Sequence, residues 1–399
     1  GNLTYNNITQ TFGNIEYNRP LQSANQTAFL PNNLSGNFTL VNTGSFTLVL
    51  NNNDPERIIT VGRDFILNGG TLQFSGATTN REAFLDVNRD INLNGGSFNN
   101  TLSPDSGFYF VGNGVQQNFS SSIVLSTQIN QRFFRIAVSG PSRINQTYQG
   151  SALQSTIWGI PQSPDYLPVQ TATSLFGDIT INNPAGVTLS TAQTINQNLF
   201  LTNGTLTNST NNIVLTANTT VQRTGGSVSN LLGGTGLYNV IYPTHTAQVT
   251  AGNEIPDSAT RLQNVTINNT NGVKASKTFQ VNGILNLGTA NPTLTNGLLD
   301  MVISYGNYAK RVYGESGYFD STNQYNNLNS YELRLGASAT VTGQGDVTGK
   351  IRRNHTFVSG SPYSFGSANM RMTFTSVSGS ALPSQMLITA TRGNQGVHV

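Results

Sequence analysis

The chain has 399 residues, of which 36% are hydrophobic and only 9% are charged, and its formal net charge is +3. One hydrophobic core rarely serves so many residues, so the length predicts either several domains or a repeat array that grows in one dimension. The basic residues form no stripe interleaved with aromatics, which argues against nucleic acid as a partner. The lack of cysteine excludes disulfides and thiolate metal sites, and no apolar run is long enough to predict a membrane-spanning helix.

A first repeat lies in the N-terminal part of the chain. The segment from Ile59 reads ITVGRDFILNGGTL, and the segment from Leu85 repeats it 26 residues later as LDVNRDINLNGGSF. That period suits one coil of a β-solenoid, built from two or three short strands and their corners. Asn-Gly-Gly is typical of corners where φ must be positive, and it places Asn68 and Asn94 at equivalent corners.

A second, longer unit begins at Phe176 and recurs at Leu262, where FGDITINNPAGV aligns with LQNVTINNTNGV. Apolar residues alternate with Thr, Asn or Ser in both copies, which predicts strands with one buried face. Asn182 and Asn268 occupy equivalent corners. Identical amides in stacked coils hydrogen-bond along the stack, so the sequence predicts corner or ladder roles for four residues: Asn68, Asn94, Asn182 and Asn268.

These patterns predict an all-β chain, a parallel β-solenoid (β-helix) with a C-terminal cap or small antiparallel β region. A cap is expected because the last coil of a solenoid exposes unpaired strand edges, and open edges also predict end-to-end association. The expected divisions are N-terminal coils at 1-150, an irregular Pro-rich insertion or junction with Trp158 at 151-172, central coils at 173-338, and the cap or a β-sandwich-like region at 339-399.

Asp64 and Asp90 fall at equivalent places one coil apart. Neighbouring strands lie about 4.8 Å apart, and paired carboxylates at about 5 Å are what a retaining glycosidase uses. The alternative is that each aspartate caps a corner or pairs with Arg63 or Arg89. Repeated positions usually serve the repeat itself, so we favour the structural interpretation.

The other residues that could bind a ligand or act in catalysis are far from one another in the sequence. Histidines occur only at His245, His355 and His398, and a basic group runs from Lys350 to His355; we interpret both as surface features. The run from Gly233 begins like a calcium-binding β-roll turn, but Tyr238 replaces the required aspartate. The sequence therefore predicts no catalytic residue, no metal site and no cofactor.

Four strings together resemble the repeat regions of large cell-surface adhesins and other secreted proteins of Bacteroidota, many of them exported by the type IX system. They are LxNxTINNxxGV from Leu262, GTGLYNVIYPTHTAQVTAGNEIP from Gly234, VGRDFILNGGTL from Val61, and GxIxR…YxFG from Gly349 to Gly366. The resemblance implies an extracellular protein, secreted or at the cell surface. Its implied partners are copies of itself, other surface proteins or polysaccharide. These proteins also resemble one another in carrying O-glycans on Asp-Ser/Thr patterns, which occur here at Ser258 and Ser321.

We therefore expect a non-catalytic structural or adhesive protein, a rigid cell-surface rod or filament component. The alternative is a glycan-binding or polysaccharide-degrading β-helix, which fold analogy suggests. Such an enzyme needs a clustered acid and base in one groove, whereas the 17 acidic residues of this chain are scattered along it.

Overall fold

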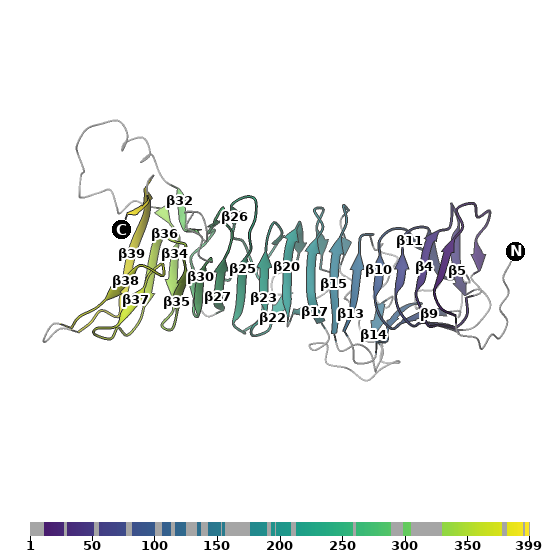
Figure 1. Cartoon of the computed structure of the whole chain (residues 1–399), viewed down its shortest axis with the longest axis horizontal. Helices are drawn as coiled ribbons and strands as arrows, with labels where there is room; N and C mark the ends of the chain where they lie inside the picture. The colour runs from purple at the N-terminus through teal and green to yellow at the C-terminus, as the bar shows by residue number, and fades with distance from the viewer. Residues whose placement is uncertain are drawn as a thin grey trace, which may run out of the picture. The chain divides into compact units, whose positions relative to one another are not determined.

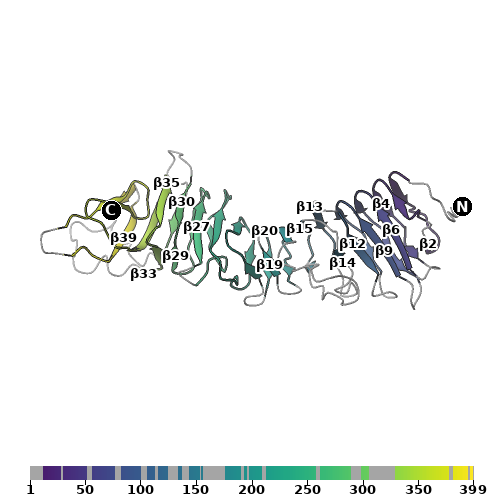
Figure 2. The same cartoon turned by 90° about the horizontal axis from the view of Figure 1, so that it is seen from below.

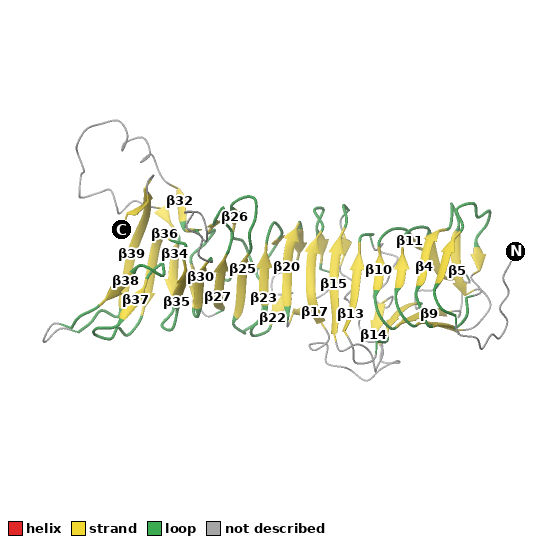
Figure 3. Cartoon of the chain, viewed as in Figure 1, coloured by secondary structure: helices red, strands yellow, loops and turns green. Residues whose placement is uncertain are grey.

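The fold is an all-β parallel solenoid, as the sequence predicted (Figure 1). No helix occurs among the residues that the structure describes, which consist of strands, turns and short loops (Figure 3). The computed structural model describes residues 12–27, 30–51, 56–76, 82–99, 106–112, 116–124, 134–136, 143–152, 154–155, 176–189, 193–195, 197–208, 213–257, 261–288, 298–304, 329–376, 381–393 and 396–398.

The chain forms two compact units. Residues 1–199 with 203–214 make up the first, and residues 200–202 with 215–399 make up the second. The predicted junction at 151-172 lies mostly outside the described residues, and Trp158 is among those outside.

In the first unit, successive strands up to residue 110 join three different parallel sheets in turn, so that three strands complete one coil (Figures 1 and 2). The first sheet contains β1 (Ile15–Asn18), β4 (Phe38–Asn42), β7 (Phe65–Leu67), β10 (Ile91–Leu93), β13 (Gln116–Ser121), β15 (Arg143–Gln149), β17 (Phe176–Asn182) and β20 (Asn198–Asn203) in that order. The second contains β2 (Gln26–Thr27), β5 (Thr47–Asn51), β8 (Thr71–Ser75) and β11 (Ser97–Phe98). The third contains β3 (Asn33–Leu34), β6 (Glu56–Val61), β9 (Glu82–Val87), β12 (Gly107–Phe110) and β14 (Phe134–Ile136).

Shorter strands complete the later coils of this unit. β16 (Gln154–Ser155), β18 (Val187–Thr188) and β21 (Thr205–Thr207) pair in that order, and β19 (Gln193–Ile195) pairs with β22 (Ile213–Leu215).

The core of the first unit consists of columns of like residues from successive coils. Phe38, Phe65, Ile91 and Phe119 are paired in register on β4, β7, β10 and β13, and all four are buried. The rings of Phe38 and Phe65 lie 5.5 Å apart, and Phe108 from β12 approaches Phe65 to 4.9 Å. Burying each such side chain stabilises the fold by about 2–3 kcal/mol, so stacking like residues supplies most of the driving force for adding a coil.

Glycines turn the chain at the predicted corners. Gly70 and Gly96, the second glycines of the two Asn-Gly-Gly steps, have φ of +75° and +81°. Side chains rarely adopt this conformation, so the corner chemistry predicted from the sequence is present.

The second unit continues the same alternation of buried and half-buried residues. One run of parallel strands contains β23 (Thr220–Arg223), β25 (Tyr238–Tyr242), β27 (Leu262–Ile267), β30 (Ile284–Leu287) and β35 (Thr340–Gly343). Another sheet contains β26 (Val249–Thr250), β28 (Val273–Lys274), β31 (Leu299–Asp300), β36 (Val347–Asn354), β34 (Glu332–Leu335) and β29 (Phe279–Val281). Val240, Val265, Leu285 and Val341 form a buried column in register. β24 (Ser227–Val228) also belongs to this unit.

The C-terminal part of the second unit turns antiparallel. β39 (Gln385–Gly393) pairs antiparallel with β36, and β40 (Gly396–His398) pairs antiparallel with β39. Two further antiparallel pairs are β37 (Pro362–Ser364) with β38 (Arg371–Thr373) and β32 (Val302–Ser304) with β33 (Asn329–Ser330). β35 and β36 follow residue 339 yet still pair in parallel with coil strands, so the antiparallel cap begins after them.

The β37–β38 hairpin covers the last coil. The Val341 N–H of β35 donates to Ser364 Oγ at 3.2 Å, and the Val347 N–H donates to the Gly366 carbonyl at 2.9 Å. Phe365 between them is fully buried. The β35 edge, which the sequence alone suggested to be open, is therefore covered by the cap that the sequence also predicted.

Candidate functional site

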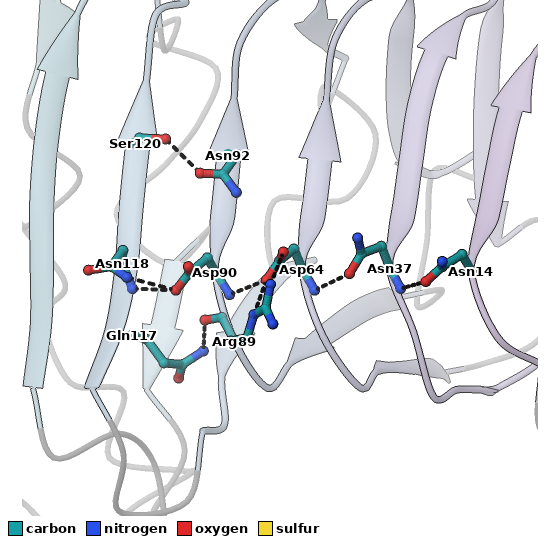
Figure 4. A network of polar contacts seen from close by, with 9 residues as sticks. All are labelled: Asn14, Asn37, Asp64, Arg89, Asp90, Asn92, Gln117, Asn118 and Ser120. Carbon is teal, nitrogen blue, oxygen red and sulfur yellow. Dashed lines mark hydrogen bonds and ion pairs between the residues drawn. The ribbon is translucent and has the colours of Figure 1, made fainter.

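A ladder of Asn and Asp side chains runs along the first sheet of the first unit (Figure 4). Each member lies at or near the start of a strand, and the Oδ1 of every member except the last accepts a hydrogen bond from the next member along the stack. The donors are backbone N–H groups at 2.8 to 3.2 Å, except that the Asn145 side-chain amide donates to Asn118 Oδ1 at 3.2 Å. We call this set the Asx ladder; its members are Asn14, Asn37, Asp64, Asp90, Asn118, Asn145, Asp178 and Asn198.

Local sequence explains why the ladder forms. Asn and Asp have short side chains whose oxygens readily accept bonds from nearby backbone N–H groups. Each ladder member comes just before an inward-facing residue of its strand, such as Phe65 after Asp64 or Ile91 after Asp90. Burial of that residue fixes the register of the coil, so the oxygen of one coil lies against the N–H of the next.

The two candidate carboxylates, Asp64 and Asp90, are consecutive ladder members. Arg89 binds Asp64 through two hydrogen bonds, Nε to Oδ1 at 2.8 Å and Nη2 to Oδ2 at 2.7 Å. These bonds raise the pKa of Arg89 above its ordinary value. Asp90 Oδ1 accepts both the backbone N–H and the side-chain amide of Asn118, at 2.9 and 3.1 Å. Asp64 therefore pairs with Arg89, and both aspartates hold neighbouring coils together.

The predicted corner residues are placed as follows. Asn94 Nδ2 donates to Asn68 Oδ1 at 2.9 Å, which is an amide ladder contact between adjacent coils. Asn182 pairs in register with Gln149, and the Asn268 N–H donates to the Tyr242 carbonyl at 2.8 Å, so these two stack on different neighbours. Ser258 and Ser321 lie outside the described residues.

The asparagines that follow them, Asn183 and Asn269, are the fully buried ones. The Asn183 amide donates to the Ala152 carbonyl at 2.6 Å, and the Asn269 amide donates to the Ala247 carbonyl at 2.9 Å. Each side-chain oxygen accepts a backbone N–H two residues further on. This pair of corner amides was visible in the sequence as Asn-Asn, and burial distinguishes the second asparagine from the first.

The histidines lie in separate surroundings. His245 Nδ1 lies 3.2 Å from both the N and the carbonyl O of Ala247. His355 packs against the rings of Tyr363 and Phe357, at 4.8 and 5.6 Å between centroids. His398 belongs to β40.

The basic group on β36 divides between the two faces of the strand. Arg352 binds Glu332 at 2.9 and 3.0 Å, and Glu332 also accepts a bond from Arg334 at 2.8 Å. Burial raises the pKa of Glu332, but the bonds from Arg352 and Arg334 outweigh it and lower the pKa below its ordinary value. Arg353 is buried and binds the Ser364 carbonyl at 3.1 Å, and that burial lowers its pKa. The group thus contributes to the cap, and the surface interpretation was wrong for Arg353, which alternates inward on the strand.

Sequence reasoning missed a buried ion pair in the second unit. Glu254 is fully buried and accepts bonds from Arg223 Nη1 at 2.6 Å and from the Tyr242 hydroxyl at 2.8 Å. The Tyr238 hydroxyl donates to the Glu254 carbonyl at 2.8 Å. Burial raises the pKa values of both tyrosines. The sequence clue to this pair was the inward position of Tyr238 and Tyr242 on their strand, because buried tyrosine hydroxyls need polar partners.

Tyr238 is the residue that replaces the calcium-binding aspartate, and its ring lies in the core instead of at a turn. In the part of the chain that the structure describes, no three acidic or histidine side chains gather closely enough to hold a metal ion. The described residues also include no helix able to cross a bilayer.

Comparison with known proteins gives no match: no family model, no curated protein and no solved structure is similar to this chain.

Proposed function

We propose that the chain is a non-catalytic structural and adhesive protein of an extracellular surface, a rigid component that associates with copies of itself or with other surface proteins. This agrees with its resemblance to repetitive secreted proteins of Bacteroidota. The Asx ladder carries the proposal, because the carboxylates and amides that the repeat conserves from coil to coil are used in holding coils together.

The outer face of the same sheet supports adhesion through small polar groups. Thr39, Ile66, Asn92, Ser120, Thr147 and Thr180 form one row in register, and all are half-buried. The Ser120 hydroxyl and Asn92 Oδ1 in this row are 2.8 Å apart (Figure 4). Apart from Ile66, such a row offers hydroxyl and amide groups to a flat partner.

The first strand of this sheet offers a route to self-association. Among the described residues β1 has one neighbouring strand, β4. The Ile15 N–H donates to the Asn37 carbonyl at 2.8 Å, and alternate residues of a parallel strand face opposite neighbours, so the Glu16 N–H points away from β4. A strand edge whose N–H groups have no partner among the described residues is a template for a strand from another chain.

We propose that the occupant of this edge is β1 of a second copy. Antiparallel pairing centred on Tyr17 places the exposed Glu16 of one copy opposite the exposed Asn18 of the other, so that each carboxylate meets an amide donor. Because β1 pairs with β1, this contact is isologous and closes on two copies. The β35 edge is covered, so a filament needs a further contact.

The test is light scattering and electron microscopy of the full chain over a wide concentration range. Glu16→Pro removes the outward N–H together with the carboxylate, at an edge position where proline is tolerated, and Glu16→Gln is the matched control that loses only the charge and keeps the N–H. We expect the wild type and Glu16→Gln to pair and Glu16→Pro to stay single with an unchanged midpoint of thermal unfolding. Pairing of Glu16→Pro at wild-type strength would reject the edge contact, and a flexible, non-rod-like particle in micrographs would reject the structural proposal.

A glycan-binding protein is the second candidate, favoured by the outer face of the third sheet. The half-buried Tyr109 is in register with the half-buried Asp86, and its ring packs 5.3 Å from the buried Phe84 ring at 65°. An aromatic ring beside a carboxylate suits a sugar, which presents one apolar face and several hydroxyls. Tyr109→Ala should abolish binding on a polysaccharide array if this candidate is correct, and an array without any bound glycan for the wild type would reject it.

A further inference from the structure

Five Asn-Gly steps lie within the described residues, at Asn68, Asn94, Asn203, Asn271 and Asn282. Asparagine followed by glycine is prone to a spontaneous reaction in which the glycine nitrogen attacks the asparagine side-chain carbonyl carbon. The reaction requires the glycine N–H to lose its proton and to rotate toward the side chain. A glycine N–H that is donated to a carbonyl can do neither until that hydrogen bond breaks.

Four of the five glycines donate their N–H to a backbone carbonyl. Gly69 donates to Leu40 at 3.3 Å, and Gly95 donates to Leu67 at 3.0 Å. Gly272 donates to Asn269 at 3.0 Å, and Gly283 donates to Gln263 at 2.6 Å. The fold therefore restrains the reacting nitrogen at all four of these steps.

Asn203-Gly204 is different. The N–H of Gly204 donates to no acceptor in the hydrogen bonding of the described residues. Side-chain exposure does not separate this step from the others, because Asn68, Asn94, Asn203 and Asn271 are all exposed. The state of the glycine N–H is the feature that distinguishes Asn203.

The backbone also requires glycine at this corner. Gly204 has φ of +77°, and a Cβ built on it would lie 1.8 Å from the Asn183 carbonyl oxygen. No side chain fits there, so the reactive step cannot be removed by replacing the glycine, and only Asn203 is free to change.

We infer that Asn203 is a spontaneous deamidation site of the folded chain. The Gly204 nitrogen forms a bond to Cγ of Asn203, the Cγ–Nδ2 bond breaks, and ammonia leaves, which gives a cyclic succinimide. Water then opens the ring to aspartate or isoaspartate. No electrons are exchanged, and water is the only co-reactant.

The reaction alters a contact between coils. The Asn203 carbonyl accepts the Asn183 N–H at 3.2 Å, across the corner where β20 leads into β21. Isoaspartate adds a backbone carbon between Asn203 and Gly204, and either product adds a negative charge. Deamidation therefore loosens this junction and marks the age of a long-lived molecule.

The test is to incubate the folded full chain at mildly alkaline pH, well below its unfolding temperature, and to follow each Asn-Gly peptide by mass spectrometry and isoaspartate detection. Asn203 should react at least about fivefold faster than the other four, since breaking one hydrogen bond costs about 1 kcal/mol. In denaturant, where every glycine N–H is free, the five rates should converge.

The variant Asn203→Gln should abolish the signal at this position and leave the other four rates unchanged, because a glutamine side chain forms the corresponding ring far more slowly. Equal rates at all five steps in the folded chain, or a faster rate at Asn68 or Asn271 than at Asn203, would overturn the inference. So would a difference between the five rates that persists in denaturant.

Discussion

The most informative single residues are polar side chains that serve the backbone of a neighbouring coil. Asn269 bridges two backbone carbonyls, and Asp64 accepts the Asp90 N–H at 3.2 Å. A net hydrogen bond contributes about 1 kcal/mol, whereas a buried group left without a partner costs about 1–3 kcal/mol. Such positions are therefore sensitive to loss of the acceptor and tolerant of changes that keep it.

Two substitutions of Asp64 can distinguish the contribution of its ladder hydrogen bond from that of its negative charge. Asp64→Asn keeps Oδ1 for the Asp90 N–H and loses the charge and the Oδ2 acceptor that bind Arg89, whose side chain is 55% exposed. We expect Asp64→Asn to cost below about 1 kcal/mol and Asp64→Ala to cost about 2 kcal/mol in the free energy of unfolding. Chemical denaturation measures both. Equal losses for the two variants would mean that the charge, not the ladder contact, is important.

Glu254 is the most costly charge to remove. Glu254→Gln leaves Arg223, whose side chain is only 13% exposed, without its counter-ion, and should cost about 3 kcal/mol in unfolding free energy. The control is Asp257→Asn, which breaks a pair with Lys277 at a carboxylate that is 64% exposed, and should cost less than about 0.5 kcal/mol. Thermal and denaturant unfolding compare the two, and a mild Glu254→Gln variant would contradict the buried-pair interpretation.

Asp86 makes stability depend on pH. Burial first, and Glu56 second, raise the pKa of Asp86 from 3.8 to about 6. The folded chain thus holds this proton more tightly than the unfolded chain, so stability from this group is complete below pH about 4 and is lost as the pH rises to about 6. Asp86→Asn should raise stability by about 1 kcal/mol above that range, allowing for solvent screening, and leave it unchanged below. The same gain at both pH extremes would show that ionisation is not the cause.

Among the elements, the β37–β38 hairpin protects the rest of the second unit. Ser364 Oγ and the Gly366 carbonyl accept hydrogen bonds from N–H groups of β35 and β36, and Phe365 is buried between these two residues. The Phe357 and Tyr363 rings pack edge to face, 4.9 Å apart at 90°, and the Phe374 ring lies 4.2 Å from Phe357 at a tilt of 41°. The cap thus combines edge protection with an aromatic core of its own.

Removing the Phe365 side chain from the cap should cause aggregation as well as a loss of stability. Phe365→Ala should cost about 3–4 kcal/mol and free the β35 edge to pair with other chains. Static light scattering during thermal unfolding should show aggregation below the wild-type onset temperature. Val358→Ala, at a side chain that is 57% exposed, is the control and should resemble the wild type.

The strands and corners were predictable because they depend on local pattern. Ile179 and Ile181 alternate with polar residues and are buried, and Gly70 and Gly96 have the positive φ that Asn-Gly-Gly implies. Contacts set by register were not predictable. Arg223 and Glu254 belong to no shared motif, and Asn118 joins the ladder only because β13 lies beside β10. The sequence suggested Asp64 and Asp90 as a pair but did not reveal the other members of the ladder.

At the scale of the whole molecule, each unit grows by repetition, and each coil contacts mainly its own neighbours. Stability in such arrays is approximately a sum of coil terms and nearest-neighbour interface terms. Damage to one coil should therefore remain near that coil.

Hydrogen exchange can test this. Phe65→Ala removes a fully buried ring from the first unit and should cost about 3–4 kcal/mol locally. We expect lower protection in β4, β7 and β10 and unchanged protection in β25 and β27 of the second unit. A uniform loss of protection in both units would instead mean that the chain unfolds as one cooperative body.

Because of the Asx ladder, the first unit can change its length by whole coils. The residue before β4 and the residue before β7 are both ladder members, Asn37 and Asp64, and each is followed by a buried phenylalanine. Excising Phe38 through Asp64 joins Asn37 directly to Phe65 and recreates the same junction, with the Asn37 oxygen ready for the N–H of Asp90. Insertion or deletion of a whole coil therefore needs no new contact at the junction between the remaining coils.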